Sequence, residues 1–576
     1  MTRASRVQLS LAALAVAFAA ADTYVVVLAL PSMMTTAGLS VDQLQRAAPI
    51  ISGFLLGYVA ILPLIGRISD LRGRRPVLVA SLTIFALGSL ITALATTLGV
   101  LVTGRFLQGL GAGGLVPATL ALVADLYPVE RRAVPLGVVS AVQEIGSVIG
   151  PLFGALILAV SDWETIFWVN LGVGLVLAVA IRWSTDADGG VPRPSRSKPD
   201  YLGGLLFGLA LAGLILTLKQ PTSLVNDVVL GWPFVPLTGS STWLAPLSLV
   251  TIAFALLALV RFCLAERPLI DVRGWARSAV QADLIGALIL ALALSGVIFA
   301  FATADPAKSD LSGHAGWWLA GAIVAFAVFV VRMRKARDPL VPPGALKRRP
   351  AWASLVANFF VGCALIAALV EIPTFARLTE YPDSQLGAAL VLLRLLVAVP
   401  IGAVAGGLLT RRMSTGFVSA IAMTAVAVAN VIFARWDANS LASFWATAPL
   451  LLAGLGFGLA LAPLNSALLA ATDAAVHGLA SAFAVVARMI GMLVGVSALT
   501  EIGLHQFYSA SAKLPLATTV CGHGLTSCPA YDDRLQAAVI SQISVIFAGA
   551  AVCAVLAGVV AMLGSTRATA ESGALA

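Results

Sequence analysis

Long runs of apolar residues recur along almost the whole sequence, and they limit what the chain can fold into more than any other feature. We count about sixteen runs of roughly 17 to 28 mainly apolar residues, each long enough for a helix that crosses a bilayer. They begin near Leu9, Ala48, Val77, Val100, Ala133, Ile166, Tyr201, Leu244, Ala279, Trp317, Trp352, Gln385, Gly416, Phe444, Gly478 and Ala537. Since backbone polar groups in hydrocarbon must be satisfied within the protein, the expected fold class is an all-α polytopic membrane protein.

Composition and charge agree with this expectation. Hydrophobic residues make up 60% of the chain and charged residues 11%, and no long polar block is left to fold separately. The Lys and Arg residues behind the net charge of +9 cluster in short loops between apolar runs, which is typical of membrane orientation signals and not of nucleic-acid binding. Arg3 and Arg6 precede the first apolar run, yet a cleaved signal peptide is not expected, because many further spans follow.

Basic loops alternate with loops that are poor in Lys and Arg. If the N-terminus is cytoplasmic, the basic clusters fall in inside loops, as the positive-inside rule requires. The clusters are Arg67/Arg72/Arg74/Arg75, Arg131/Arg132, Arg193/Arg196/Lys198, Arg267/Arg273/Arg277, Arg332/Arg334/Lys335/Arg337 and Arg411/Arg412. We therefore expect a multi-pass protein of the inner (plasma) membrane whose two termini, including a tail over 566–576, are cytoplasmic.

The middle of the chain contains a repeat. Asp200-Tyr-Leu-Gly opens one apolar helix pair, and Asp283-Leu-Ile-Gly opens a second one. We interpret them as a duplicated two-helix insert, although chance similarity of two apolar hairpins is the open alternative. Six runs precede the insert and six follow it, a pattern typical of transporters built from two related halves. The expected domains are an N-terminal six-helix bundle over 1–185, a linker with inserted helix pairs over 186–348, and a C-terminal six-helix bundle over 349–565, with a periplasmic loop at 505–536.

Cysteine and histidine do not predict a metal or catalytic centre. Cys521 and Cys528 share the one long outside loop and could form a disulfide in an oxidising exterior. A metal is less expected there, because His523 alone between two thiols is not a recognised zinc pattern. Elsewhere no nucleophile and base recur at helical spacing, and no phosphate-binding glycine loop is present. We expect no metal, no direct use of ATP and no enzymatic activity.

The loop after the second apolar run carries a specific motif. Gly66-Arg-Ile-Ser-Asp70-Leu-Arg-Gly73-Arg74-Arg75 matches G-x-x-x-D-x-x-G-R-[RK], the loop signature of the major facilitator superfamily, and the chain resembles that superfamily here. The resemblance implies the major facilitator fold. Asp70 at a helix end can pair with arginines and with the positive end of a neighbouring helix, forming a latch that breaks when the cytoplasmic side opens. The alternative is a basic loop that only sets topology.

Two further segments resemble motifs of the drug/proton antiporters that have fourteen helices. Asp22-Thr-Tyr-Val-Val-Val27-Leu-Ala-Leu-Pro is similar to D-x-T-V-V-N-V-A-L-P but has valine where asparagine is usual. Arg105-Phe-Leu-Gln108-Gly is similar to the R-x-x-Q-G motif, which in that family is associated with proton coupling. The resemblance therefore implies a role of Arg105 in coupling and the proton gradient as the energy source, without a cofactor.

A glycine-rich segment in the fifth run resembles the motif that separates exporters from importers in the family. It reads Gly146-Ser-Val-Ile-Gly150-Pro151-Leu-Phe-Gly154, similar to G-x-x-x-G-P-x-x-G. Small residues permit tight helix contact, and Pro151 would supply a bend about which two halves can rock. A role of the glycines in packing alone is compatible with the same function.

Charged residues inside apolar runs are the strongest candidates for the transport machinery. Asp22, Glu144 and Arg488 fall roughly 15 to 20 Å deep when counted along their helices, and each costs at least about 2.5 kcal/mol at the bilayer centre. Burial favours a neutral carboxylate and a nearby arginine opposes this, so helix movement could load and release a proton. We expect Arg488 to be the electrostatic partner of both Asp22 and Glu144. The alternative is an ion pair that only locks the two halves. Arg394 is a further midplane charge, and Glu371, near a helix end, is expected to face water.

Three segments, around Asp22, Glu144 and Arg488, resemble the mycobacterial triacylglyceride-exporter branch of the fourteen-helix antiporters. The resemblance to the superfamily as a whole covers the chain outside about residues 200 to 345. The resemblance to this branch has further implications. It implies coupled transport through these three residues, export of triacylglycerides or related lipids, and a periplasmic lipid-carrying lipoprotein as partner. The alternative is multidrug efflux by drug/proton antiport, because an apolar cavity suits many amphiphiles. We further expect contacts with membrane lipids and a monomeric protein.

Overall fold

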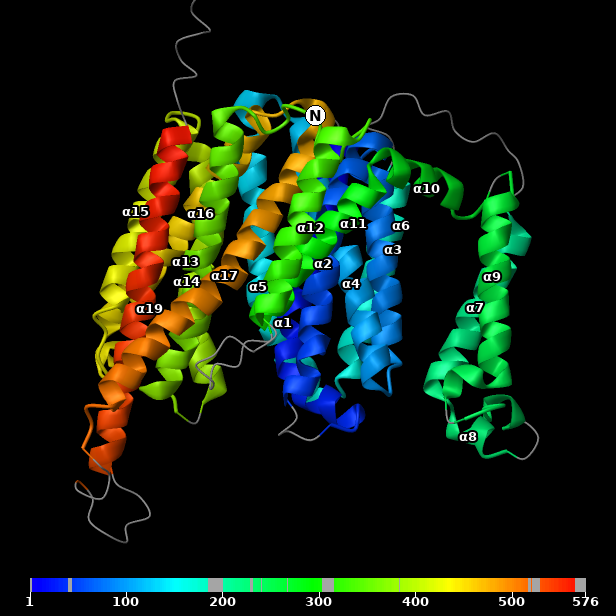
Figure 1. Ribbon diagram of the computed structural model, residues 1–576, viewed down its shortest axis with the longest axis horizontal. Helices are drawn as coiled ribbons and strands as arrows, with labels where there is room; N and C mark the ends of the chain where they lie inside the picture. The colour runs from blue at the N-terminus through cyan, green and yellow to red at the C-terminus, as the bar shows by residue number, and fades with distance from the viewer. Residues whose placement is uncertain are drawn as a thin grey trace, which may run out of the picture.

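The computed structural model describes residues 3–39, 44–184, 200–227, 231–239, 241–266, 268–302, 315–382, 384–515, 520 and 529–564. Within these ranges the secondary structure is helical and contains no β-strand. Most helices run roughly parallel along one direction, as Figure 1 shows. An all-helical polytopic architecture is thus confirmed, as expected for a chain whose backbone polar groups must be satisfied in lipid.

The six helices before residue 185 form one bundle, drawn in blue to cyan in Figure 1. They are α1 (Arg3–Thr36), α2 (Leu44–Arg72), α3 (Arg74–Ala93), α4 (Leu98–Leu126), α5 (Ala133–Val160) and α6 (Glu164–Trp183). The pairs α1 with α5, α2 with α4, and α3 with both α4 and α6 pack closely. Their shared core is rich in Ala, Val, Leu and Phe.

The last six long helices form a second bundle, drawn in yellow-green to red. They are α13 (Arg349–Leu378), α14 (Gln385–Leu409), α15 (Thr415–Phe433), α16 (Thr447–Ala470), α17 (His477–Ser511) and α19 (Pro529–Gly564). The two bundles meet along two seams, where α2 packs against α17 and α5 packs against α14. Figure 1 also shows α17 and α19 extending beyond the other helices at the end away from the N-terminus.

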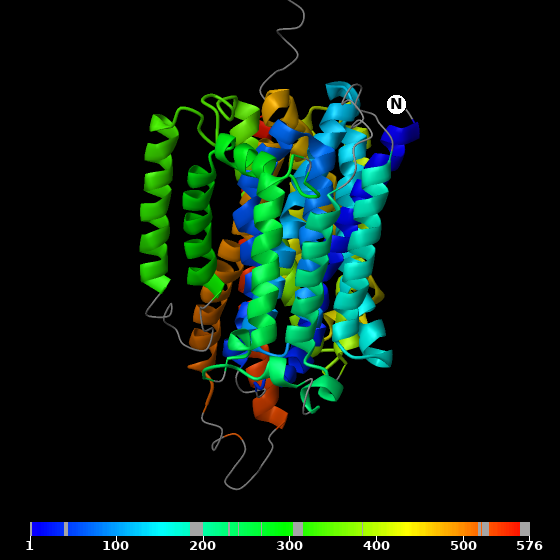
Figure 2. The same cartoon turned by 90° about the vertical axis from the view of Figure 1, so that its right-hand side faces the viewer.

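The middle of the chain forms two helical hairpins at the periphery of the bundles (Figure 2). Their helices are α7 (Tyr201–Lys219) with α9 (Pro246–Leu264) and α11 (Leu284–Ala302) with α12 (Ala315–Lys335), and the short α8 (Thr222–Val225) and α10 (Val272–Gln281) lie in the connections. Leucines of α7 pack against α3 and α6, whereas α11 packs against α2 and α17. The second hairpin therefore lies on one of the two seams.

The two hairpins share one polar arrangement at their openings. Asp200 accepts hydrogen bonds from the backbone N–H of Gly203 at 3.1 Å and from Arg261 of the second helix at 3.1 Å. Asp283 does the same with Gly286 at 3.0 Å and with Arg332 at 2.9 Å. Each aspartate caps the first helix and ties it to the end of the second one. This shared device supports the interpretation of a repeated helix pair.

The number of spans agrees with the apolar runs. Fourteen helices within the described ranges are long and apolar enough to cross a membrane, and α10 with α11 forms a further pair, bent by 73°. The helix α5, with 28 residues, is also long enough to cross a bilayer, so the helices are compatible with the sixteen predicted runs. The predicted start of the ninth span, near Ala279, is wrong, because no straight helix begins there. The chain turns at Asp283, whose φ is 61°, so that Ala279 belongs to α10 and the span proper begins at Leu284.

Candidate functional site

A cavity of about 210 Å³ lies between the two bundles. Its wall is mostly apolar and is formed by side chains from seven helices of the two bundles, namely α1, α2, α4, α5, α13, α14 and α17. Phe54, Leu365, Leu393 and Met489 are typical of the lining. Such a lining suits an apolar ligand, because acyl chains and aliphatic side chains both avoid water.

Two opposite charges face this cavity from different bundles. Glu144 lies on α5 and Arg488 on α17, and both line the wall. Arg488 is close enough to act electrostatically on Glu144, although no direct ion pair of 4 Å or less joins them among the described residues. The pair therefore spans the interface along which the two bundles would move. Gln143 and Ser147 of α5 add polar groups beside Glu144.

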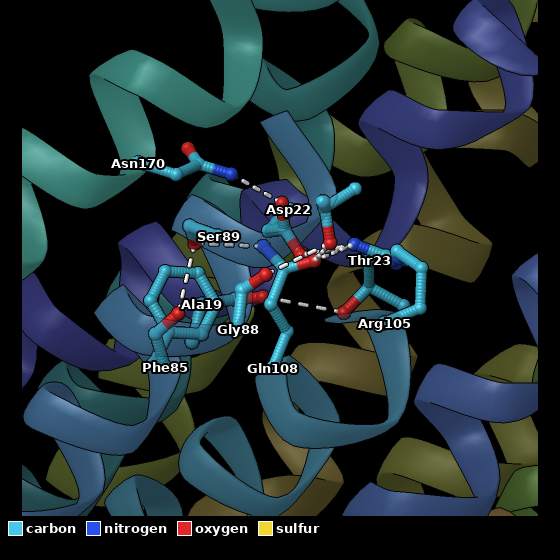
Figure 3. A network of polar contacts seen from close by, with 10 residues as sticks. Ala19, Asp22, Thr23, Phe85, Gly88, Ser89, Arg105, Gln108 and Asn170 are labelled. Carbon is cyan, nitrogen blue, oxygen red and sulfur yellow. Dashed lines mark hydrogen bonds and ion pairs between the residues drawn. The ribbon is translucent and has the colours of Figure 1, made fainter. Parts of the chain in front are cut away.

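Asp22 lies in a different environment, inside the N-terminal bundle (Figure 3). One of its carboxylate oxygens pairs with Arg105 at 2.7 Å, and the other accepts a hydrogen bond from Asn170 of α6. Both side chains of the ion pair are at most 1% exposed. Arg488 was expected to be the partner of Asp22 as well as of Glu144, and this is wrong for Asp22. Its cation is Arg105, which reaches it from α4 of the same bundle.

The network around Arg105 continues into α3. Arg105 donates to Gln108 at 2.9 Å, and Gln108 donates to Ser89 at 2.8 Å. The guanidinium also lies over the ring of Phe54, 4.4 Å from its centroid, and Phe54 in turn lines the cavity. The network thus joins four helices of one bundle and borders the cavity through an aromatic ring. Sequence reasoning missed Asn170 and Ser89, for which a polar residue inside an apolar run was the available signal.

The predicted latch residues meet the second bundle as a helix cap. Asp70 accepts hydrogen bonds from the backbone N–H of Gly478 at 2.8 Å and of Leu479 at 3.1 Å, in the first turn of α17. Arg74 pairs with the same carboxylate at 2.5 Å and with Asp125 at 2.9 Å. The Asp70 carboxylate is therefore held at the positive end of the α17 dipole, which favours its negative charge. The side chain is 1% exposed.

The other motif residues support this contact. A Cβ atom on Gly66 would lie only 2.6 Å from the carbonyl oxygen of Gly478, so only glycine allows α2 and α17 to approach this closely. Gly73 has a φ of 87°, which glycine adopts without strain, and it lets α3 start immediately after α2. Arg75 donates to the carbonyl oxygens of Ile181 and Arg182 at the end of α6.

The second seam is closed at the same end of the molecule. Near the start of α5, a Cβ atom on Gly407 of α14 would lie 2.7 Å from the carbonyl oxygen of Ala133. Since α2 ends, α17 begins, α5 begins and α14 ends at this level, both seams are tight at the end where the N-terminus lies. The cavity is therefore shut off from that end.

The glycines of the exporter-like motif face α1. A Cβ atom on Gly146 would lie 2.7 Å from the carbonyl carbon of Ala17, and one on Gly150 would lie 3.0 Å from that of Ala21. Gly154 is looser, with Val25 at 3.2 Å. These positions bring α1 and α5 together directly beside Asp22 and Glu144. The α5 helix continues through Pro151 without a break, and the predicted bend stays a prediction.

The remaining candidates fall outside the cavity or outside the described residues. Glu371 was expected to face water, but it is buried, with 7% of its surface exposed, so this expectation is wrong. Arg394 donates to Thr447 at 3.2 Å within the C-terminal bundle. Cys521 and Cys528 lie outside the described residues. Among the residues that are described, no group of three or more His, Cys, Asp or Glu side chains could hold a metal ion.

Comparisons with known proteins match this chain to one superfamily of membrane transporters. The Major Facilitator Superfamily matches residues 12–333. The triacylglyceride transporter of Mycobacteroides abscessus is 34% identical over 519 residues, which cover 88% of this chain and 84% of that protein. The triacylglyceride transporter of Mycobacterium tuberculosis is 34% identical over 581 residues, 98% of this chain and 96% of that one. A solved human organic anion transporter aligns over 96% of this chain with a TM-score of 0.50 at 14% identity, which shows similarity of fold alone.

Proposed function

Because this chain belongs to the Major Facilitator Superfamily, we propose that it exports triacylglycerides or related lipids across the inner membrane by alternating access, driven by the proton gradient. The observation that carries the proposal is the Glu144 and Arg488 pair in an apolar cavity between two bundles. The names of its relatives support a triacylglyceride as the substrate.

Glu144 is the residue through which proton binding can act on the bundles. Its carboxylate lines the cavity on α5, and the facing cation comes from α17 of the other bundle. A charged Glu144 attracts Arg488 across the cavity, whereas a protonated one does not, so each state favours a different separation of the bundles. Proton binding and bundle movement are then linked by one interaction.

Asp22 and Arg105 have a supporting role in this mechanism. Both lie in the N-terminal bundle, so their ion pair does not change length when the bundles rock as rigid bodies. The network holds α1, α3, α4 and α6 together and keeps Phe54 at the cavity wall. Asp22 influences coupling by placing the α1 residues Ala19 and Thr23, which line the cavity beside Glu144.

The resemblance in sequence also leads us to propose a monomer that passes its lipid to a periplasmic lipid-carrying lipoprotein. The ends of α17 and α19 extend beyond the other helices on the side away from the N-terminus, which is the periplasmic side if the N-terminus is cytoplasmic. Such an extension offers a surface for a lipid acceptor. Site-specific photocrosslinking from Tyr508, which is 44% exposed, should capture the lipoprotein if this proposal is correct.

The substrate is tested by reconstituting the purified protein in liposomes with a defined pH on each side. We expect an imposed pH gradient to drive movement of labelled triacylglyceride, and a proton ionophore to abolish it. A cationic amphiphilic drug is assayed in the same vesicles. If the gradient drives the drug and leaves the lipid unmoved, multidrug efflux replaces lipid export as the function.

A further inference from the structure

The short helix α10 (Val272–Gln281) lies between the two inserted hairpins and crosses the direction of the other helices (Figure 1). It is bent by 73° from α11, at the end of the molecule where the N-terminus lies. Trp275 and Ala279 pack against the core of the N-terminal bundle, and Ser278 is buried. The helix is therefore amphipathic and seated on the end of the bundle.

The helix is joined to the latch by one side chain. Arg72 ends α2, two residues after the latch carboxylate of Asp70, and pairs with Asp271 at 2.7 Å. Its guanidinium also lies over the ring of Trp275, 4.7 Å from the centroid. Asp271 in turn caps α10 through the backbone N–H of Gly274 at 2.9 Å. These contacts connect α10 directly to the last turn of α2.

This link stays charged at physiological pH. The hydrogen bond from Arg72 lowers the pKa of Asp271 below its ordinary value, which is about 4 in a model peptide. The contribution of the pair to stability is therefore complete above that pH and is lost only as the pH falls below it. Changes in proton concentration near neutrality leave the link intact, so another factor must act on α10 if its position is to vary.

The outer side of α10 has the chemistry of a lipid-headgroup surface. Arg273 and Arg277 are one helical turn apart and exposed, and neither forms an ion pair with a described residue. Beside them, Leu269 is 54% exposed and Val280 is 70% exposed. A basic helix that lies across the spans and has apolar side chains at its edges places its charges at the headgroups and its apolar groups at the acyl boundary.

We propose that α10 is a binding surface for anionic phospholipid headgroups, and that lipid bound to Arg273 and Arg277 steadies the latch through Arg72. Charge complementarity identifies the phosphate group as the ligand, and the neighbouring exposed apolar side chains favour a phosphate that belongs to a bilayer. With α10 held at the membrane surface, Arg72 keeps the last turn of α2 in place, and Asp70 remains beneath the first turn of α17.

The test uses the full chain in nanodiscs of zwitterionic lipid, with or without phosphatidylglycerol. Amide hydrogen exchange is measured at Gly478 and Leu479, whose N–H groups donate to Asp70. We expect phosphatidylglycerol to slow exchange at both amides several-fold in the wild type. The double variant Arg273→Gln/Arg277→Gln should lose this effect and keep the exchange rate seen in zwitterionic lipid, since both side chains are exposed and neither is held in an ion pair by a described residue.

A matched control removes the same charge elsewhere at the same end. Arg411 and Arg412 are exposed after α14, and Arg411→Gln/Arg412→Gln should retain the full lipid effect. Inorganic phosphate added to zwitterionic nanodiscs should leave the exchange rate unchanged. The proposal is overturned if phosphatidylglycerol does not slow exchange in the wild type, if Arg273→Gln/Arg277→Gln responds to it like the wild type, or if free phosphate reproduces the effect.

Discussion

Asp22 and Glu144 are both carboxylates at similar depth, but their surroundings differ, and we therefore expect different roles for them. Both oxygens of Asp22 are engaged, by Arg105 and by Asn170, and its side chain is fully buried. Glu144 lies at the wall of the cavity, and its cation approaches from the other bundle. A proton can therefore reach Glu144 through the cavity, whereas Asp22 is enclosed in a buried ion pair. Glu144 is the better candidate for the exchanging group.

Replacing Asp22 should show this structural role. In Asp22→Asn the guanidinium of Arg105 stays buried without a carboxylate, which should lower the free energy of unfolding by about 3–5 kcal/mol. Thermal unfolding in detergent measures the loss. The double variant Asp22→Asn/Arg105→Gln removes both charges and should recover part of the stability, because the two substitutions act on one interaction. Equal stability of Asp22→Asn and wild type would show that the pair does not hold the bundle.

The sequence predicted the depth of the candidate residues better than it predicted their partners. Depth along a helix can be counted from its end, so Asp22, Glu144 and Arg488 were recognised as midplane charges. The direction in which each side chain points around the helix axis cannot be counted in this way. For this reason Arg488 was assigned to Asp22, which in fact faces Arg105. The same gap led to the wrong prediction for Glu371, whose position near a helix end did not reveal that neighbouring helices cover it.

Among the helices, α2 and α17 are in close contact at the N-terminal end. The contact consists of a capped helix terminus and a close approach at Gly66. The motif G-x-x-x-D-x-x-G-R-[RK] contains both parts, so this contact could be predicted from the sequence. The helix α10 could not be predicted as a separate element, because its residues continue into the apolar run that follows in the sequence. The available signal was the pattern Asp-x-x-Gly, which caps α10 at Asp271 and Gly274 as it caps α7 and α11.

A methyl group at the close approach should open the latch. In Gly66→Ala the new Cβ atom would lie 2.6 Å from the carbonyl oxygen of Gly478 and 2.9 Å from the Cβ atom of Ala482, so the helices must separate. Spin labels at the exposed Val129 and Arg411, one in each half, should report a larger population of long distances. Asp70→Asn should act in the same direction by weakening the cap.

The matched control for this experiment is Gly99→Ala at the start of α4. A Cβ atom on Gly99 would meet no atom within 4 Å, so this variant gains the same methyl group without a collision. Its distance distribution should equal that of the wild type. If Gly66→Ala and Gly99→Ala give the same distribution, the close contact of α2 with α17 does not keep this end closed.

The whole molecule has one closed end and a central cavity that reaches both bundles. Both seams are tight where the N-terminus lies, so the cavity is closed toward that end in this state. The two-bundle architecture and the inserted hairpins were predicted from the spacing of apolar runs. The conformation, closed at the N-terminal end, could not be predicted from the sequence. The residues that meet at this end are separated by hundreds of positions in the sequence, as Asp70 and Gly478 are.

The closed end predicts one-sided access to the cavity. In a variant that lacks the five native cysteines, Ser147→Cys places a thiol at the cavity wall. A membrane-impermeant maleimide should modify it in right-side-out vesicles and leave it unmodified in inverted ones. Arg411→Cys, on the exposed surface of the closed end, should show the opposite pattern. Modification of Ser147→Cys only in inverted vesicles would mean that the orientation or the closed end is assigned wrongly.

The most direct test of the account is whether lipid transport moves protons through Glu144. Proteoliposomes with an internal pH dye receive a gradient of labelled triacylglyceride, and proton and lipid fluxes are recorded together. We predict that wild-type protein couples the two fluxes, and that Glu144→Gln lets lipid move down its own gradient without a pH change, while Gln143→Asn beside it keeps the coupling. A wild-type proton flux in Glu144→Gln would contradict the account.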